Sequence, residues 1–174
     1  LATSLANNDN AFVALNTAFI RHGAFVHVPK RVKIEDPIIL SFNPLPQDQT
    51  MAYYPRNLIV VEEGSEAVVV ETYLGSSVSN FTNAVTEIFL RPGAHLDYYK
   101  IQLEGSGSYH ISNTTAVLGN DSSFSSLYLD MGSKLARNDL NVVFSGEGSS
   151  CMLNGLYIAG SNQHIDNHTL VDHQ

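Results

Sequence analysis

The sequence predicts an all-β fold: a right-handed parallel β-helix of stacked coils, with a short helix at its N-terminal end. After Gly23 the chain consists of short runs rich in β-branched and aromatic residues, separated by Gly, Asn, Pro and Ser. Parallel strands in a flat sheet need crossovers of a dozen or more residues, usually helical, and no such helical pattern lies between these runs. The runs also repeat at a nearly constant period, which favours a solenoid.

Internal repetition distinguishes the β-helix from a sandwich or barrel. The repeat is an apolar run, a turn, small residues and a second apolar run, as in VVEEGSEAVVVETY, FLRPGAHLDYYKIQ, VLGNDSSFSSLYLD and FSGEGSSCMLNGLY. The predicted turn centres are Gly64, Gly93, Asn120 and Gly148, which are 29, 27 and 28 residues apart. This period is typical of stacked coils, whereas a propeller blade needs four strands and about 40 residues.

Alternating apolar residues predict which side chains face the interior of a coil. In LNVVF we expect Leu140, Val142 and Phe144 to point inward. In HLDYYKIQL the apolar alternation changes phase after Tyr98, and a phase change is typical of a corner or bulge. We therefore expect this strand to bend near its middle.

One segment, DNAFVALNTAFIRHG, reads as a helix. Apolar residues and one Asn lie at helical spacing on a narrow face, so the helix should pack against an edge or end of something larger. Asp9 or Asn10 can cap its N-terminus, and Gly23 can take the left-handed conformation that ends a helix. The face residues are Phe12, Leu15, Asn16 and Phe19.

The chain divides into a helical lead-in at residues 1–22 and a β-helix core at residues 23–174. The stretch SFNPLPQDQTMAYYPRN holds three of the six prolines and reads as a mobile loop between coils. The chain lacks an initiator Met and ends without a natural stop signal, so we expect it to be a piece of a longer protein.

Composition narrows the function classes. The formal net charge is −8, which argues against nucleic acid and anionic membranes as partners. A single cysteine, Cys151, excludes an internal disulfide and fits the reducing cytoplasm. No apolar stretch reaches the roughly 20 residues that span a bilayer.

The C-terminal stretch QHIDNHTLVDHQ is the densest cluster of residues that could bind a metal. On a strand, His164, Asp166 and His168 would share one side with Asp172, while His173 would face the other side. Imidazole and carboxylate groups suit zinc or non-haem iron. The alternative, which we favour, is a ladder of polar side chains on a solvent-facing strand.

The remaining residues that could carry chemistry point to no reaction. No charge flanks Cys151 to activate its thiol, so a buried, unreactive cysteine is the better interpretation. His22, His27, His95 and His110 are scattered, and the glycine-rich EGSGSYH lacks the Lys and the helix of a phosphate-binding loop. We name no catalytic and no cofactor-binding residue.

Several strings, in this order, resemble the SufB/SufD family of iron–sulfur cluster assembly proteins. The family has a helix with an ALN-x-AF pattern, then G-x-x-V-x-VP and a PI-x-L strand, all present in DNAFVALNTAFIRHGAFVHVPKRVKIEDPIIL. The stretches NLIVVEEGSEAVVVE and IFLRPGAHLDYYKIQ are similar to successive family coils. The ending GLYIAGSNQHIDNHTLVDHQ is closer to the SufD branch than to SufB.

The resemblance implies a non-catalytic scaffold subunit. Such proteins form a complex of a SufB-like paralogue, a SufD-like partner and a SufC-like ATPase, on which an iron–sulfur cluster is held transiently. The β-helices of the paralogues pair, and a homodimer through the β-helix is a further expectation. Relative to the family, we expect this chain to lack the N-terminal helical region, the last coils and the C-terminal helices that dock the ATPase.

Two other functions fit a β-helix. A lyase-like carbohydrate-active enzyme would need clustered Asp for calcium, a basic catalytic residue and aromatic sugar platforms, but the chain has no Trp and few Arg. A passive structural or adhesin β-helix would need no ATPase partner.

Overall fold

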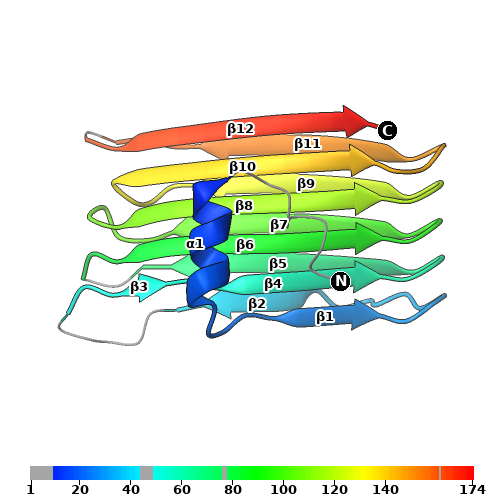
Figure 1. Cartoon of the computed structure of the whole chain (residues 1–174), viewed down its shortest axis with the longest axis horizontal. Helices are drawn as coiled ribbons and strands as arrows, with labels where there is room; N and C mark the ends of the chain where they lie inside the picture. Colours follow the sequence, from blue (N-terminus) through cyan, green and yellow to red (C-terminus); the bar gives the residue numbers. More distant parts are fainter. Residues whose placement is uncertain (1–9, 44–48, 76–77, 161) are drawn as a thin grey trace.

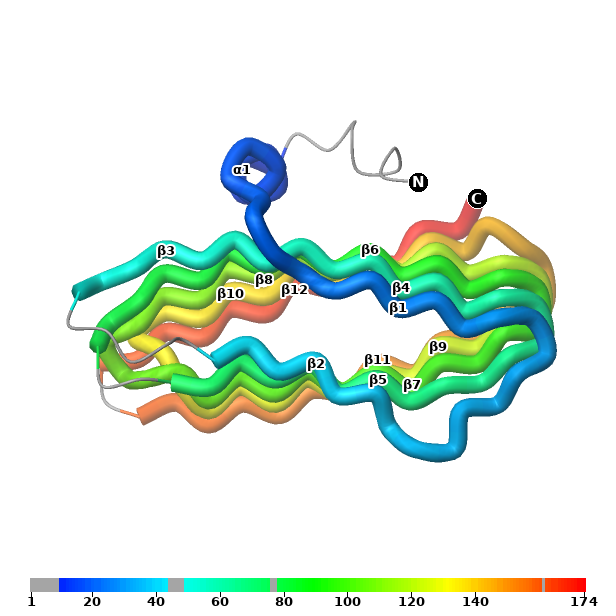
Figure 2. Tube along the Cα trace, turned by 90° about the horizontal axis from the view of Figure 1, so that it is seen from below, coloured from blue at the N-terminus to red at the C-terminus, as the bar shows by residue number. Residues whose placement is uncertain are grey.

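The computed structural model describes residues 10–43, 49–75, 78–160 and 162–174. It forms a β-solenoid of about four turns, in which every pair of neighbouring strands is parallel. Figures 1 and 2 show two sheets facing each other, with the chain passing from one sheet to the other in each coil. The predicted parallel β-helix is therefore confirmed.

Each coil contributes one strand to each sheet. The larger sheet has seven strands: β1 (Phe25–Val28), β4 (Arg56–Val61), β6 (Phe81–Leu90), β8 (Tyr109–Leu118), β10 (Leu135–Phe144) and β12 (His164–His173) in spatial order, with β3 (Ala52–Tyr53) beside β6. The smaller sheet has five: β2 (Ile38–Phe42), β5 (Glu66–Leu74), β7 (His95–Leu103), β9 (Ser123–Asp130) and β11 (Ser150–Tyr157).

The strand register confirms the repeat. In the five-stranded sheet Glu66 pairs with His95, His95 with Ser123, and Ser123 with Ser150, so successive coils are 29, 28 and 27 residues apart. Stacking at this period gives every central strand two hydrogen-bonded neighbours, which removes the edge problem of a single coil.

The turns that join the two sheets are held by residues in the left-handed region. Gly64, Gly93 and Gly148 have φ near 65–70°, as predicted. In the fourth predicted turn the left-handed residue is Asp121, with φ of 54°, and not the predicted centre Asn120. Asn120 instead accepts a hydrogen bond from the Gly93 amide through its backbone carbonyl, at 2.8 Å, which links adjacent turns.

One half of the space between the sheets is an apolar core. There the inward side chains of successive strands stack in columns, as Val61, Leu90 and Leu118 do. Leu140 and Val142 are buried in this core and Phe144 packs against it, so the inward pattern of LNVVF is confirmed. The other half is polar and is described in the next subsection.

The expected bend in β7 is wrong. Its burial alternates without a change of phase, so Lys100 and Gln102 take the inward positions after Tyr98. The apolar Tyr99, Ile101 and Leu103 lie on the outer face of the sheet. The physical reason is that the polar interior satisfies Lys100 and Gln102, so the strand keeps its period of two.

Helix α1 (Ala11–Phe19) lies across the outer face of the seven-stranded sheet, as Figures 1 and 2 show. The Asn10 side chain caps it by accepting from the Phe12 and Val13 amides, as predicted, whereas Asp9 lies outside the described residues. Asn16 is buried and donates from Nδ2 to the carbonyls of Pro55 at 3.0 Å and Asn83 at 2.8 Å. The helix is thus anchored to the sheet by a polar side chain.

The expected apolar face of this helix is only partly correct. Asn16 is buried and Leu15 is half-buried, but Phe12 and Phe19 are 38% and 52% exposed. Val13, which the spacing did not select, is buried against Val85. The reason is that the main apolar core lies between the two sheets, whereas α1 packs on the outer face of one of them. The helix therefore makes only a narrow contact with the sheet.

The predicted loop SFNPLPQDQTMAYYPRN contains the end of β2, all of β3 and the start of β4. Its centre, residues 44–48, lies outside the described residues.

Gly23 does not end the helix. The C-cap is Ile20, with an extended conformation, and Gly23 has no positive φ. Its role is close approach: a methyl group at Gly23 would lie 1.8 Å from the Arg56 carbonyl oxygen. The chain needs glycine here because β4 passes directly beside the segment that leads from α1 to β1.

We expect Gly23→Ala to destabilise the protein by about 1–3 kcal/mol, the usual cost of overpacking, because the clash is with backbone. The matched control is Gly155→Ala, where the nearest atom to an added methyl is the Tyr128 carbonyl oxygen at 4.0 Å. Thermal unfolding followed by circular dichroism measures both. Equal melting temperatures for the two variants would contradict the close approach.

Candidate functional site

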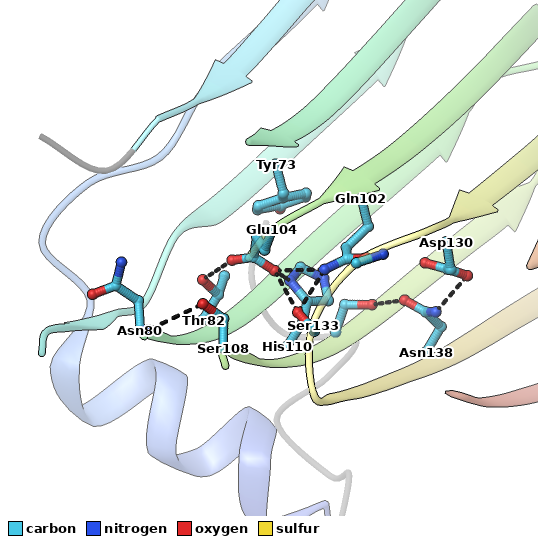
Figure 3. A network of polar contacts seen from close by, with 12 residues as sticks. Tyr73, Asn80, Thr82, Gln102, Glu104, Ser108, His110, Asp130, Ser133 and Asn138 are labelled. Carbon is cyan, nitrogen blue, oxygen red and sulfur yellow. Dashed lines mark hydrogen bonds and ion pairs between the residues drawn. The ribbon is translucent and has the colours of Figure 1, made fainter. Parts of the chain in front are cut away.

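The polar half of the interior is a connected network of buried side chains from β5 to β10. We call it the polar network, and Figure 3 shows most of its members. Its inward positions are register neighbours on successive coils, so ionisable groups from distant parts of the sequence meet inside the solenoid. Its members are Glu71, Tyr73, Thr82, Thr86, Tyr98, Lys100, Gln102, Glu104, His110, Ser112, Asp130, Ser133 and Asn138.

A chain of three ionisable groups forms its centre. His110 Nδ1 lies 2.8 Å from Glu104 Oε2, and His110 Nε2 lies 2.9 Å from Lys100 Nζ. An ammonium can only donate, so Nε2 must accept and the ring proton is on Nδ1, facing the carboxylate. His110 is therefore a neutral imidazole that links an anion to a cation.

Further hydrogen bonds extend this chain in both directions. Lys100 Nζ donates to Ser112 Oγ at 2.6 Å and to the Asn138 side-chain oxygen. Asn138 Nδ2 donates to Asp130 Oδ2 at 2.9 Å and to Asn167 Oδ1 at 2.8 Å, which reaches the last coil.

At the other end, Glu104 accepts from Thr82, from Gln102 Nε2 at 3.0 Å and from the Ser133 hydroxyl at 3.4 Å. Gln102 Oε1 in turn accepts from the Gly132 amide at 2.9 Å. These bonds hold the turn after β7 and the turn after β9 against the same carboxylate.

A second buried carboxylate, Glu71, accepts hydrogen bonds from three hydroxyl groups. The donors are Tyr73, Tyr98 at 2.7 Å and Thr86 at 3.1 Å. Burial and the Glu71 charge raise the pKa of both tyrosines well above the usual value, so they stay protonated donors.

The electrostatics of the network are unbalanced. Among the described residues inside the coil, the carboxylates of Glu71, Glu104 and Asp130 surround one ammonium, that of Lys100. Burial lowers the pKa of Lys100, and these three carboxylates oppose the shift. Burial and Lys100 lower the pKa of His110, which keeps the imidazole neutral.

Glu104 stays ionised in spite of its burial. Burial would raise its pKa, but the contact with His110 and the hydrogen bonds from Gln102 and Thr82 lower the pKa to about 2. The arrangement can therefore hold charge and a proton at defined atoms. Lys100 and His110 are 1% and 0% exposed, so no macromolecular substrate reaches them.

A cavity of about 230 Å³ lies next to the network at the C-terminal end of the solenoid. Asn138 and Asn167 line it together with Tyr128, Gly155 and Thr169. Because Gly155 has no side chain, the column that contains Glu71, Lys100 and Tyr128 ends in open space. The cavity therefore borders the polar network at Asn138.

The C-terminal residues behave as a surface strand. His164 and His168 are exposed on β12, and His168 Nε2 is 2.8 Å from Asp166 Oδ1, which also pairs with Arg137 at 3.2 Å. His173 faces the other side and stacks on Phe144, with ring centroids 4.7 Å apart. Within the described ranges, no group of three His, Cys, Asp or Glu side chains is placed to hold a metal ion.

Cys151 lies half-buried on β11 against the apolar core. Partial burial raises the pKa of its thiol, which disfavours the reactive thiolate. The predicted burial of Cys151 is thus only partial, and its lack of reactivity stays a prediction.

Sequence reasoning missed the polar network. His110 is one of the scattered histidines of the sequence, and the predicted phase change after Tyr98 would turn Lys100 and Gln102 outward. A usable signal existed in the repeat: aligning the coils at Glu66 and His95 puts Glu71 and Lys100 in one inward column.

The comparisons with known proteins identify the family. Residues 45–174 match the model described as SUF system FeS cluster assembly, SufBD core domain, and residues 2–40 match the SufBD protein N-terminal region. The chain belongs to the SufBD family. The N-terminal match includes α1, β1 and the start of β2, and the division at residue 22 stays a prediction.

Curated relatives agree with this assignment. An iron–sulfur cluster assembly SufBD family protein of Synechocystis sp. is 27% identical over 95% of this chain, and the assembly protein SufB of Bacillus subtilis is 31% identical over 91%. A SufBD family protein of Staphylococcus epidermidis is 31% identical over 89%. The chain spans 38%, 34% and 33% of these relatives, so it corresponds to about a third of their length.

No helix formed by the described residues has the length and apolar character that crossing a membrane requires.

Proposed function

We propose that this chain is the β-helix portion of a SufD-like scaffold subunit in a cytoplasmic SufBCD-type complex. Its partners would be a SufB-like paralogue and a SufC-like ATPase, and the complex would assemble iron–sulfur clusters. The cluster is cargo held transiently by the complex. The observation that carries the proposal is that family matches to both the N-terminal region and the core domain together include most of the chain.

The structure supports a scaffold more than an enzyme. Lys100, Glu104 and His110, whose pKa values are perturbed, lie inside the coil, where their contacts stabilise the stacking of the strands. The C-terminal histidines, which suggested a metal, are engaged with Asp166 and with the Phe144 ring in two of three cases. Of the three functions considered from the sequence, the family match favours iron–sulfur assembly.

The test is to co-express the gene encoding this chain with its SufB-like and SufC-like partners, purify the complex anaerobically and measure iron and sulfide. We expect the three proteins to copurify with bound cluster. We also expect His164→Ala, His168→Ala and His173→Ala to leave cluster content unchanged, because we interpret these histidines as structural residues of β12.

Two results would change the proposal. Failure of the three proteins to copurify would remove the complex subunit function. Loss of cluster in a histidine variant whose complex is intact would place that histidine in the assembly site. Arg137→Ala is the matched control, because it also breaks the surface contacts of Asp166 without removing a metal-binding group.

A further inference from the structure

A polar pocket of about 380 Å³ lies on the outer face of the seven-stranded sheet, beside the N-terminal end of α1. Figure 1 shows α1 crossing this sheet with one end at β10, where Asn10 Nδ2 donates to Asp139 Oδ2 at 3.3 Å. We call it the outer pocket, and its polar lining includes Asn10, Asn113, Arg137, Asp139, Asn141 and His168. Its volume is in the range that suits a small organic ligand.

The strand register places the lining side chains in two neighbouring columns. Asn113 on β8 pairs with Asp139 on β10, which pairs with His168 on β12. Asn141 lies two residues beyond Asp139 and pairs with Thr115 on β8. Side chains two positions apart share one face of a sheet, so these groups meet outside the coil. None of these five residues is a member of the polar network.

Three buried oxygen atoms at this place have no hydrogen-bond partner among the described residues. They are Asn113 Oδ1 in the pocket lining, Thr115 Oγ1 in the column of Asn141, and Oε1 of Glu87, which pairs with Thr115. Asn113, Thr115 and Glu87 are 4%, 7% and 3% exposed. Native proteins satisfy nearly all buried polar groups, so these oxygens call for a hydrogen-bond donor. The pocket is the place from which a ligand can bring that donor to Asn113.

A primary ammonium group matches these acceptors, because it has three donors and no acceptor. Register neighbours on adjacent strands are about 4.8 Å apart, so a nitrogen between Asn113 and Asp139 can lie within hydrogen-bond distance of both. Asp139 keeps acceptor capacity, because Arg137 at 3.1 Å and Asn10 at 3.3 Å each use one lone pair of its carboxylate. The side-chain oxygen of Asn141, in the next column, is the third acceptor.

The charges around the outer pocket favour a cation. Arg137 is engaged by two carboxylates, those of Asp139 at 3.1 Å and Asp166 at 3.2 Å. His168 is also held by Asp166, at 2.8 Å from its Nε2. Two carboxylates and one guanidinium leave one formal negative charge, on a chain whose net charge is −8. A bound anion would approach both carboxylates, whereas an ammonium would balance the excess.

Two other classes of ligand fit the outer pocket less well. An anion would need the free amides at the start of α1, but those of Phe12 and Val13 already donate to Asn10 Oδ1. A transition metal would need about three imidazole, thiolate or carboxylate ligands. The part of the chain that the structure describes brings no such group of three together.

We propose that the outer pocket binds a ligand through a primary ammonium group, with Asn113, Asp139 and Asn141 as the acceptors. The ammonium supplies the donor that the buried Asn113 oxygen lacks, and Leu170, which also lines the pocket, contacts the carbon chain of the ligand. The inference uses residues outside the polar network and does not rest on the proposed role in iron–sulfur assembly.

Titration of the 174-residue chain with n-butylamine, followed by nitrogen–proton NMR spectra, tests the proposal. We expect saturable shifts of the side-chain amide signals of Asn113 and Asn141. The Asn113→Leu variant should raise the dissociation constant about 10-fold or more, the usual effect of losing a hydrogen bond to a charged group. Asn141→Leu, at a half-buried position, is the second variant and should act in the same way.

Two control ligands and one control variant separate hydrogen bonding from charge. The alcohol n-butanol has the same carbon chain without the charge, and tetramethylammonium has the charge without an N–H donor. Neither should give saturable shifts at the concentrations at which n-butylamine does. Asn154→Leu, at an exposed position of β11 in the other sheet, should leave the dissociation constant of n-butylamine unchanged.

A further ligand, Nα-acetyl-lysinamide, identifies the source of the ammonium group. Binding tighter than that of n-butylamine would support the pocket with a lysine side chain of a protein as its occupant, and weaker binding would support it with a free amine. Equal dissociation constants for tetramethylammonium and n-butylamine would overturn the proposal. So would wild-type affinity in both Asn113→Leu and Asn141→Leu, or the absence of saturable shifts in the wild type.

Discussion

Replacing Lys100 with methionine is expected to lower the free energy of unfolding by about 3–5 kcal/mol, the usual cost of removing one partner from a buried ion pair. Methionine has nearly the volume of lysine, so the loss of stability measures the contribution of the ammonium group. Without the ammonium, His110 Nε2, Ser112 and Asn138 lose a donor at once. The three buried carboxylates would then face one another without a cation.

Urea unfolding followed by circular dichroism measures this loss. The control is Lys33→Met, because Lys33 forms a surface pair with Glu66 in which both side chains are about half exposed. Its unfolding midpoint should not change, since exposed pairs are screened by water and salt. A loss below about 1 kcal/mol for Lys100→Met would mean that Lys100 is neutral in the folded protein.

The fold was predictable because it depends on features that repeat. A period of 27–29 residues recurs from coil to coil, and so do turns with a residue in the left-handed region, which is a glycine at positions 64, 93 and 148. The shift from Asn120 to Asp121 shows the limit: two neighbouring residues of similar turn preference compete for one left-handed position. The choice of the left-handed residue depends on the hydrogen bonds that Asn120 and Asp121 form with the adjacent turns.

The polar network was not predictable from hydropathy. Alternation in β7 continues through Lys100 and Gln102, and the side chains that satisfy Lys100 come from residues 10 to 38 positions away. A buried Lys is stable only when such partners meet it, and that depends on the stacking register of several coils. The pattern of residues within one strand does not predict these contacts between different coils.

The same register explains why the apolar residues of β7 lie outside. Once the polar side chains occupy the interior, Tyr99, Ile101 and Leu103 must face outward, where they join the columns of β5, β9 and β11. The polar interior and the apolar outer surface of the five-stranded sheet are therefore two consequences of one strand phase. Inverting the phase would expose Lys100 and bury the leucines, but it would also remove Leu96 and Tyr98 from the core.

Acidification is expected to destabilise the protein in two ranges of pH, with Glu104 responsible for the lower one. The folded-state pKa of Glu104 is about 2, below its ordinary value of 4.5. The stabilising effect of this carboxylate is therefore complete above pH 4.5 and is lost as the pH falls from 4.5 towards 2. A shift of this size corresponds to about 3 kcal/mol.

His110 acts at higher pH. Burial lowers its pKa in the folded protein, so the unfolded chain binds a proton below about 6.5 while the folded one does not. Stability therefore begins to fall as the pH drops below 6.5. Urea midpoints measured from pH 7 downward should show both declines.

The Glu104→Gln variant separates the effect of Glu104 on stability from that of His110. Glutamine still accepts the proton of His110 Nδ1 but does not titrate, so the variant should be less stable than wild type at pH 7. The difference in free energy of unfolding between the variant and the wild type should narrow between pH 4.5 and 2, because only the wild type has a carboxylate at residue 104 that becomes protonated there. Glu63→Gln, at a surface carboxylate that is 46% exposed, should follow the wild-type pH profile throughout. A gap between Glu104→Gln and wild type that stays constant with pH would show that the Glu104–His110 contact is not the source of acid sensitivity.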